Sequence, residues 1–271
     1  MSQQELFHKL WNNYTDRNPH ALKVHDLFEQ QGEKIINDHV AFRTFNDPRV
    51  NVEALARVFT ALGYQEKGSY DFPVKKLFAK HYEHKDPEAP KVFISELLVD
   101  QFSKPLQQIA KECVDKIPEK LLGTEELLFS GATWQPLSYQ TYQNLLNESE
   151  YAAWMYAFGF CANHFTVNVN ALKKFKEIKD VNDFLIQHGF KLNTSGGAIK
   201  GTPQDFLEQS STLAGGIDVK FSEGTFTIPS CYYEFAKRYP MADGKLYTGF
   251  VAASADKIFE STDVSVGKNK S

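Results

Sequence analysis

A short string that occurs twice is the feature that most restricts how this chain can fold. The two copies are residues 38–42 (DHVAF) and 163–167 (NHFTV), and both patterns are typical of a strand. A predicted helix and then a glycine–aromatic pair follow each copy, with the glycine 24 residues after the first histidine and 25 after the second. About three strands complete each copy. The repeat therefore predicts an α+β fold of two βαβββ modules that face each other across a cleft.

The rest of the chain divides around these two modules, and all segments are expected to form one compact unit. We expect N-terminal helices within 1–37, a first module over 38–100, a helical insertion or cap over 101–160, a second module over 161–235 and a C-terminal extension over 236–271. The extension ends in a polar tail that is predicted to be disordered. Strands of the second module are expected at 190–194, 196–200, 217–221 and 225–235.

Composition argues against several classes of protein. The 271 residues carry a formal net charge of −4, whereas proteins that bind nucleic acid normally present a basic face. No apolar run reaches the ~18 residues of a membrane span, and the N-terminus lacks the features of a signal peptide. Three cysteines, Cys113, Cys161 and Cys231, cannot all pair with one another. Reduced thiols and a cytoplasmic location are therefore expected.

His39 and His164 occupy the same position in the two strings. A lone histidine on a strand is more often structural than a metal ligand, but two at equivalent positions of a repeat carry more weight. If the first strands of the two modules meet at a shared cleft, the two imidazoles face each other there. Because imidazole is a common ligand of iron, zinc and copper, the repeat predicts a metal site between the modules.

Another strand of the same cleft should supply a third ligand, and Glu234 is the best candidate. The stretch 225–235 is otherwise neutral, and a carboxylate in so apolar a strand is costly unless it is paired or binds a metal. The alternative is an ion pair between Glu234 and Arg238. Glu96 near the end of the first module is interpreted as the equivalent of Glu234, and it is kept as a substitute ligand.

The ligand types also indicate which metal is bound. Two histidines and one carboxylate leave three neighbouring positions open, the arrangement of non-heme iron(II) oxygenases. Iron(II) is therefore the predicted metal, and zinc is an alternative from the ligand types alone. His81 and His84 lie in a charged stretch, HYEHKDPE, and are expected on a solvated loop rather than in a metal site.

Arg43 follows His39 by four residues. Side chains alternate along a strand, so Arg43 shares a face with His39 and should project into the metal cleft. A guanidinium there can hold a substrate carboxylate through two parallel hydrogen bonds, which would make Arg43 both a substrate-binding and a catalytic residue. The alternative is an ordinary salt bridge on an exposed face.

Four stretches carry a resemblance to a known family: DHVAFRTF, NHFTVNVN, CYYEFAKR and GFVAASADKIFEST. Most of the chain resembles the 2-oxoadipate dioxygenase/decarboxylase family, within the vicinal oxygen chelate superfamily. The first stretch is the most specific, because it holds histidine and arginine at the family's spacing. This chain is shorter than the larger family members, with less sequence between its two histidines.

The resemblance implies a ligand set, a substrate and a reaction. It implies that His39, His164 and Glu234 bind iron(II). It also implies that Arg43 holds a carboxylate of a 2-oxo acid and that Ser254 lines the pocket. The implied reaction consumes dioxygen and converts 2-oxoadipate into 2-hydroxyglutarate and carbon dioxide. No separate co-substrate is needed, because the substrate supplies its own 2-oxo acid.

Two other functions fit the same residues. A metal-dependent isomerase, lyase or hydrolase on this fold would act without dioxygen, or would prefer zinc or nickel. A non-catalytic protein that binds a small molecule would need no metal, and two histidines at matching positions speak against it. One scaffold can host many activities, so fold alone does not separate these functions. The sequence gives no indication of the oligomeric state.

Overall fold

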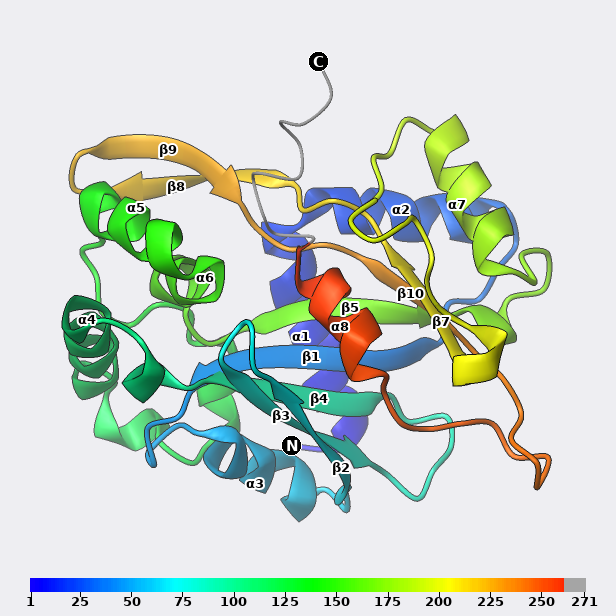
Figure 1. Cartoon of the computed structure of the whole chain (residues 1–271), viewed down its shortest axis with the longest axis horizontal. Helices are drawn as coiled ribbons and strands as arrows, with labels where there is room; N and C mark the ends of the chain where they lie inside the picture. The colour runs from blue at the N-terminus through cyan, green and yellow to red at the C-terminus, as the bar shows by residue number, and fades with distance from the viewer. Residues whose placement is uncertain (261–271) are drawn as a thin grey trace.

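An eight-stranded sheet forms the centre of the molecule (Figure 1). The structure is a computed structural model that describes residues 1–260. The order across the sheet is β2-β3-β4-β1-β5-β10-β7-β6. The strands are β1 (Asn37–Phe45), β2 (Gln65–Phe72), β3 (Leu77–Glu83), β4 (Lys91–Leu97), β5 (Ala162–Asn168), β6 (Lys200–Thr202), β7 (Leu207–Ser211) and β10 (Glu234–Arg238). The predicted disordered tail lies outside the described residues.

Strands β1 and β5 run antiparallel, side by side, at the middle of this sheet. Strand β4 pairs in parallel with β1 and β10 pairs in parallel with β5, so the two halves of the sheet repeat the same order. Helix α3 (Val52–Ala61) follows β1, and helix α7 (Ile178–Gln187) follows β5. The prediction of an α+β fold with two βαβββ modules is confirmed. Their first strands adjoin, and Ala41 lies opposite His164.

The stretch 225–235 was expected to be one strand, and that expectation is wrong. Strand β9 (Gly224–Pro229) pairs only with β8 (Gly216–Phe221) in a separate two-stranded sheet, and the module's own last strand begins at Glu234. Between them, Trp154 donates to the Ser230 carbonyl at 2.7 Å and Asn18 accepts from the Cys231 N–H at 3.0 Å. These bonds use backbone groups that a continuous strand would need. Because β10 continues to Arg238, the second module extends past residue 235.

The expected strand at 190–194 does not form either. Its sequence makes one isolated bridge, between Leu192 and Thr212. Gly196 and Gly197 follow with φ of 68° and 105°, values that lie outside the range of a β-strand. The second module's outer strand, β6, therefore starts only at Lys200.

Two N-terminal helices, α1 (Gln3–Arg17) and α2 (Pro19–Gln30), lie behind the sheet in the view of Figure 1. Ser2 and Glu5 form a capping box that starts α1, and Pro19 occupies the first turn of α2. Helix α1 buries Leu6, Leu10 and Tyr14 against the core. The Tyr14 hydroxyl donates to the Tyr232 carbonyl at 2.5 Å, which ties α1 to the residues just before β10.

The segment between the two modules is helical. Its helices are α4 (Lys104–Asp115), α5 (Tyr139–Glu148) and α6 (Glu150–Phe158). Short 3-10 helices accompany the regular ones, at Val99–Gln101, Glu119–Leu121, Glu125–Phe129, Val169–Ala171 and Pro203–Asp205. A final helix, α8 (Ala252–Phe259), crosses in front of the central strands in Figure 1. Helices α6 and α8 both contribute to the site described below.

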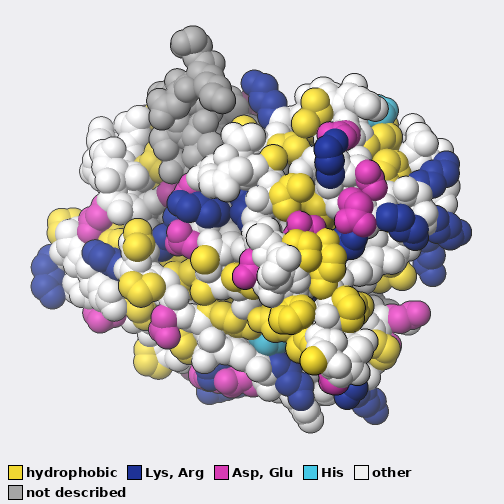
Figure 2. Space-filling model, turned by 45° about the vertical axis from the view of Figure 1, so that its right-hand side comes forward, with side chains coloured by type: hydrophobic (Ala, Val, Ile, Leu, Met, Phe, Trp, Pro, Cys, Tyr) yellow, Lys and Arg dark blue, Asp and Glu magenta, His cyan; other side chains and the backbone are white. Residues whose placement is uncertain are grey.

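The described chain has a mixed polar and apolar surface (Figure 2) and three buried cysteines. No helix among residues 1–260 is long and apolar enough to cross a membrane. On the face shown in Figure 2, basic and acidic side chains are interspersed between apolar ones. Cys113, Cys161 and Cys231 are all buried and none forms a disulfide in the described chain.

Candidate metal centre

The structure brings His39, His164 and Glu234 together. One ligand atom from each residue lies within 4.8 Å of the other two. The two imidazole rings are 5.5 Å apart between centroids and nearly perpendicular, at 83°. His39 is on β1, His164 is on β5 and Glu234 begins β10, so three adjacent strands each supply one donor. All three side chains are buried.

Glu234 faces both histidines with different oxygens. Its Oε2 lies 3.0 Å from His164 Nε2, and its Oε1 lies 3.6 Å from His39 Nε2. Burial alone would raise the pKa of Glu234, but the two histidines lower it overall. Burial lowers the pKa of His164 below its ordinary value. An ionised carboxylate and a neutral imidazole are the states in which these groups bind metal ions.

The residue before each histidine determines which ring nitrogen faces the centre. His39 Nδ1 lies 2.8 Å from an oxygen of Asp38, and His164 Nδ1 lies 2.9 Å from the amide oxygen of Asn163. Because these oxygens only accept, each Nδ1 carries the proton and a neutral ring presents a lone pair at Nε2. A lone pair and a carboxylate oxygen 3.0 Å apart repel each other unless a proton or a metal ion lies between them. The donor set therefore fits a bound metal ion.

Arg238 pairs with Asp38 rather than with Glu234. Its Nε and Nη2 donate to the two oxygens of Asp38 at 2.7 and 2.8 Å, and Nη1 donates to the carbonyls of Tyr247 and Gly249. Burial alone would raise the pKa of Asp38, but Arg238 holds it well below its usual range. The alternative of a Glu234–Arg238 ion pair is therefore wrong, and the arginine instead supports the residue that orients His39.

Asp38→Asn is expected to weaken metal binding about 10- to 100-fold, the usual effect of losing a carboxylate that hydrogen-bonds to a ligating histidine. Asparagine keeps an oxygen that can accept from His39, as Asn163 does for His164, but it loses the negative charge. Competition with a metal-binding dye measures the affinity. The control is Asp38→Asn combined with Arg238→Gln, which should recover thermal stability without recovering affinity. Wild-type affinity in the single variant would limit Asp38 to a structural role.

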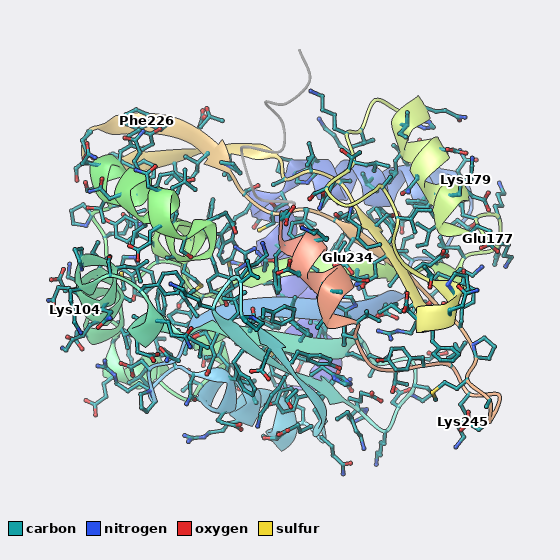
Figure 3. All side chains as sticks on the ribbon, viewed as in Figure 1. Lys104, Glu177, Lys179, Phe226, Glu234 and Lys245 are labelled. Atoms are coloured by element: carbon teal, nitrogen blue, oxygen red, sulfur yellow. The ribbon has the colours of Figure 1, made fainter. Side chains whose placement is uncertain are left out.

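A small cavity lies directly against the three candidate ligands. Aromatic residues Phe93, Tyr232 and Phe250 line it together with Gln209, and α8 covers it with Ala255, Ile258 and Phe259. Figure 3 places Glu234 near the centre of the molecule, at α8. The cavity measures about 20 Å³, which is room for about one water molecule. Gln209 donates to Glu234 Oε1 at 2.5 Å and so holds the carboxylate in place.

Glu96 is not the equivalent of Glu234, contrary to the prediction. In the strand register Glu234 lies opposite Thr166, two residues after His164, and the residue opposite the corresponding Ala41 is Phe93. Glu96 instead accepts from the Val52 N–H at 2.8 Å, at the start of helix α3. The third candidate ligand therefore comes from the second module alone. Residue spacing alone gave the wrong counterpart of Glu234, because the strands of the two modules differ in length and spacing.

Arg43 is fully buried beside this site, which rules out the alternative of an exposed surface salt bridge. Its guanidinium donates to Glu150 of α6 at 3.0 Å and stacks over the rings of Tyr151 and Trp154. It also lies 5.9 Å from the ring of Phe259, which lines the cavity. Burial alone would lower the pKa of Arg43, but Glu150 raises it overall. The arginine stays charged next to the cavity wall.

Ser254 lies on α8, one residue before the part of the helix that lines the cavity. It is buried, and its hydroxyl faces Gly201 of β6, where an added Cβ would meet it at 3.2 Å. His81 was expected on a solvated loop but is buried in β3, between the Tyr70 hydroxyl and Glu83. It faces Phe250, which also contacts the ring of His39.

Sequence reasoning missed the supporting residues Asp38, Asn163 and Gln209, and it offered Arg238 as a partner of Glu234 rather than of Asp38. Asp38 and Asn163 were visible in the repeat, since a polar side chain precedes the histidine in both strings. Gln209 carried no such signal, because its role depends on the pairing of β7 and β10.

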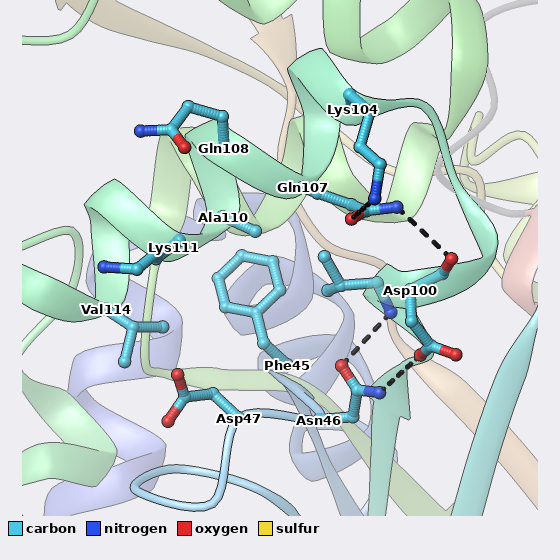
Figure 4. A pocket seen from close by; sticks show the side chains of 11 residues that line it. Phe45, Asn46, Asp47, Asp100, Lys104, Gln107, Gln108, Ala110, Lys111 and Val114 are labelled. Carbon is cyan, nitrogen blue, oxygen red and sulfur yellow. Dashed lines mark hydrogen bonds between the residues drawn. The ribbon is translucent and has the colours of Figure 1, made fainter.

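Residues 1–260 also contain a large surface hollow and a second group of possible metal ligands, and neither resembles the centre above. A hollow of about 550 Å³ lies between the end of β1 and α4 (Figure 4). Its polar side chains already bond one another, as Asn46 does with Asp100 at 2.8 Å. The second group lies on α2 and consists of His25, Asp26 and Glu29, whose two acids are exposed. The buried centre on three strands is therefore the candidate site.

Comparisons with known proteins cover most of the chain. The family model described as 2-oxoadipate dioxygenase/decarboxylase matches residues 4–246. A chloroplastic protein of that name from Arabidopsis thaliana is 37% identical over 277 residues, which cover 92% of this chain and 74% of the relative.

Two solved structures share the fold closely. The hydroxyglutarate synthase of Oryza sativa, in complex with 2-oxoadipate, is 34% identical with a TM-score of 0.90, covering 98% of this chain and 95% of that one. A protein of Shewanella frigidimarina, provisionally named a hydrolase, is 52% identical with a TM-score of 0.88. The match covers 93% of this chain and 98% of that one. The two neighbours carry names from different classes of enzyme.

Proposed function

This chain belongs to the 2-oxoadipate dioxygenase/decarboxylase family, and we propose that it is an iron(II) enzyme that oxidatively decarboxylates a 2-oxo dicarboxylic acid. With 2-oxoadipate and dioxygen as substrates, the products are 2-hydroxyglutarate and carbon dioxide. One oxygen atom enters the new carboxylate and the other becomes the hydroxyl, so the reaction balances. The observation that carries this proposal is the buried group of His39, His164 and Glu234.

The two histidines and the glutamate would hold the iron on one side and leave the side toward α8 for substrates. Iron(II) there would bring the 2-oxo acid and dioxygen together and carry electrons between them. The chain itself orients the metal-binding side chains and excludes water from the site. Asp38 and Asn163 fix the imidazole rings, Gln209 fixes the carboxylate, and the aromatic lining excludes water.

Arg43 is the residue we assign to a substrate carboxylate. It lies on the same strand as His39, four residues further on, and next to the cavity wall at Phe259. Its planar guanidinium can offer two parallel hydrogen bonds to a carboxylate. Because the cavity holds about one water, a six-carbon acid fits only if α8 moves outward or its side chains repack.

Turnover with different metals and acids tests the proposal. The apoprotein is reconstituted without oxygen with iron(II), zinc or nickel, and then given 2-oxo acids of different chain lengths with or without dioxygen. We expect 2-hydroxyglutarate from 2-oxoadipate only with iron(II) and dioxygen present together. Conversion that proceeds equally well without dioxygen would refute the proposed reaction.

A metal-dependent hydrolase is the second candidate. The name of the 52%-identical relative and the compatibility of the donor set with zinc support it. In that case the zinc-loaded protein would hydrolyse a substrate without dioxygen, and iron would confer no oxygen uptake. The same reconstitution experiment separates the two candidates.

A further inference from the structure

Lys200 is a buried cation that the proposed chemistry has not used. Its residue is 3% exposed, and its ammonium donates to the Asn193 carbonyl at 2.5 Å. Within residues 1–260 it forms no ion pair, although an ammonium has three donors. Burial lowers its pKa to about 8, so much of the population is still charged at neutral pH. A buried charge without a directly paired counter-ion is costly, which points to a role for Lys200.

The strand register places Lys200 on the same face as the metal centre. It lies directly opposite Gln209 on β7, and Gln209 lines the cavity and donates to Glu234. Residues opposite each other on paired strands present their side chains to the same face. The other side of Lys200 adjoins α8, because its acceptor Asn193 also donates to the Lys257 carbonyl there. Lys200 thus lies beneath the helix that covers the cavity.

No carboxylate near Lys200 forms an ion pair with it in the described chain. Against the effect of burial, Glu234 and Glu260 both raise the pKa of Lys200, but Glu260 pairs with Lys75 and Lys257, and Glu234 faces the two histidines. Asp38 pairs with Arg238, and Arg43 pairs with Glu150. Glu234 offsets one of the two charges of a divalent metal, which leaves one positive charge at the metal and one on Lys200. A dicarboxylate brings two negative charges and balances both, whereas a monocarboxylate leaves one cation buried without a partner.

We propose that Lys200 compensates the second carboxylate of the substrate and so makes the site selective for dianionic over monoanionic 2-oxo acids. The inference rests on the proposed function for its substrate class. Arg43, whose charge Glu150 already offsets, would orient a carboxylate through directional hydrogen bonds, while Lys200 supplies the balancing charge. The flexible lysine stem allows the ammonium to turn from the Asn193 carbonyl toward the ligand.

Lys200→Met tests this, because methionine keeps most of the length of the unbranched side chain and removes the charge. Binding is measured by calorimetry without oxygen, on metal-loaded protein, with 2-oxoadipate and with 2-oxohexanoate, which has the same six carbons but one carboxylate. We expect affinity for 2-oxoadipate to fall roughly 30-fold or more, as when one partner of a buried charge pair is removed. Affinity for 2-oxohexanoate should stay within about threefold, or rise. Lys200→Arg should retain the preference for the diacid.

The matched control is Lys237→Met, on the strand that carries Glu234. Lys237 already pairs at 2.5 Å with Glu177, the residue before α7, so its loss should leave both affinities unchanged. Equal weakening of both acids by Lys200→Met, or no change in either, would overturn the proposal. Thermal unfolding verifies that the variants are folded, with Lys200→Gln as the substitute if methionine is not tolerated. Failure of the wild type to consume dioxygen would refute the proposed function, while the binding ratio would still test Lys200.

Discussion

Replacing Glu234 by glutamine should abolish turnover and weaken iron(II) binding by more than about 100-fold. This exceeds the usual effect of losing a residue that only hydrogen-bonds to a metal ligand. The carboxylate is the only anionic ligand of the group and faces both imidazoles. Without it, two neutral rings remain and the metal keeps its full charge in a buried site. His39→Ala and His164→Ala should abolish turnover as well. Metal content after dialysis and oxygen uptake with 2-oxoadipate measure the effects.

Glu96→Gln is the matched control for that series. Glu96 lies on β4, in the first module, and accepts from the backbone at the start of α3. Its loss should lower thermal stability slightly and leave the metal content unchanged. Full activity in any one of the three ligand variants would remove that residue from the site.

Arg43→Met is expected to lower kcat/KM for 2-oxoadipate about 100-fold or more while metal binding persists. The methionine cannot hold a carboxylate, and removing one partner of a buried charge pair costs on the order of 2–5 kcal/mol. Part of that loss would come from leaving Glu150 without Arg43, since the two now pair at 3.0 Å. Steady-state kinetics and metal content together measure the effect.

A double variant separates these two contributions. Arg43→Met with Glu150→Gln removes both charges, so it should recover most of the thermal stability lost in the single variant. It should not recover kcat/KM, because no guanidinium is left to orient the substrate carboxylate. Recovery of activity in the double variant would show that Arg43 serves the fold and not the substrate.

The repeat was sufficient to predict the two modules and the meeting of His39 with His164. Alternation along a strand shows which residues share a face, and matched spacing shows that the two modules are related. Both features can be recognised from the sequence alone. Glu234 could be identified because a carboxylate among apolar residues needs a partner. The residue of the first module that corresponds to Glu234 could not be identified, because it depends on the strand register. That register gives Phe93 rather than Glu96.

Long-range partners account for most of what the sequence could not predict. Glu150 pairs with Arg43 across 107 residues, and Arg238 reaches Asp38 across 200. Neither pairing leaves a local pattern, and the same holds for the placement of α8 over the cavity and of Lys200 beneath it. The start of β10 could not be predicted for a related reason. The inserted hairpin β8–β9 has the same alternation of apolar and polar residues as the strands of the module.

Isotope labelling tests the central claim most directly. The iron(II)-loaded protein is supplied with 2-oxoadipate and dioxygen that contains only ¹⁸O, and the product is analysed by mass spectrometry alongside carbon dioxide release. The account predicts 2-hydroxyglutarate with one labelled atom in the hydroxyl and one in the new carboxylate, and equal amounts of carbon dioxide formed and dioxygen consumed. Product without label, or carbon dioxide release that does not depend on dioxygen, would contradict it.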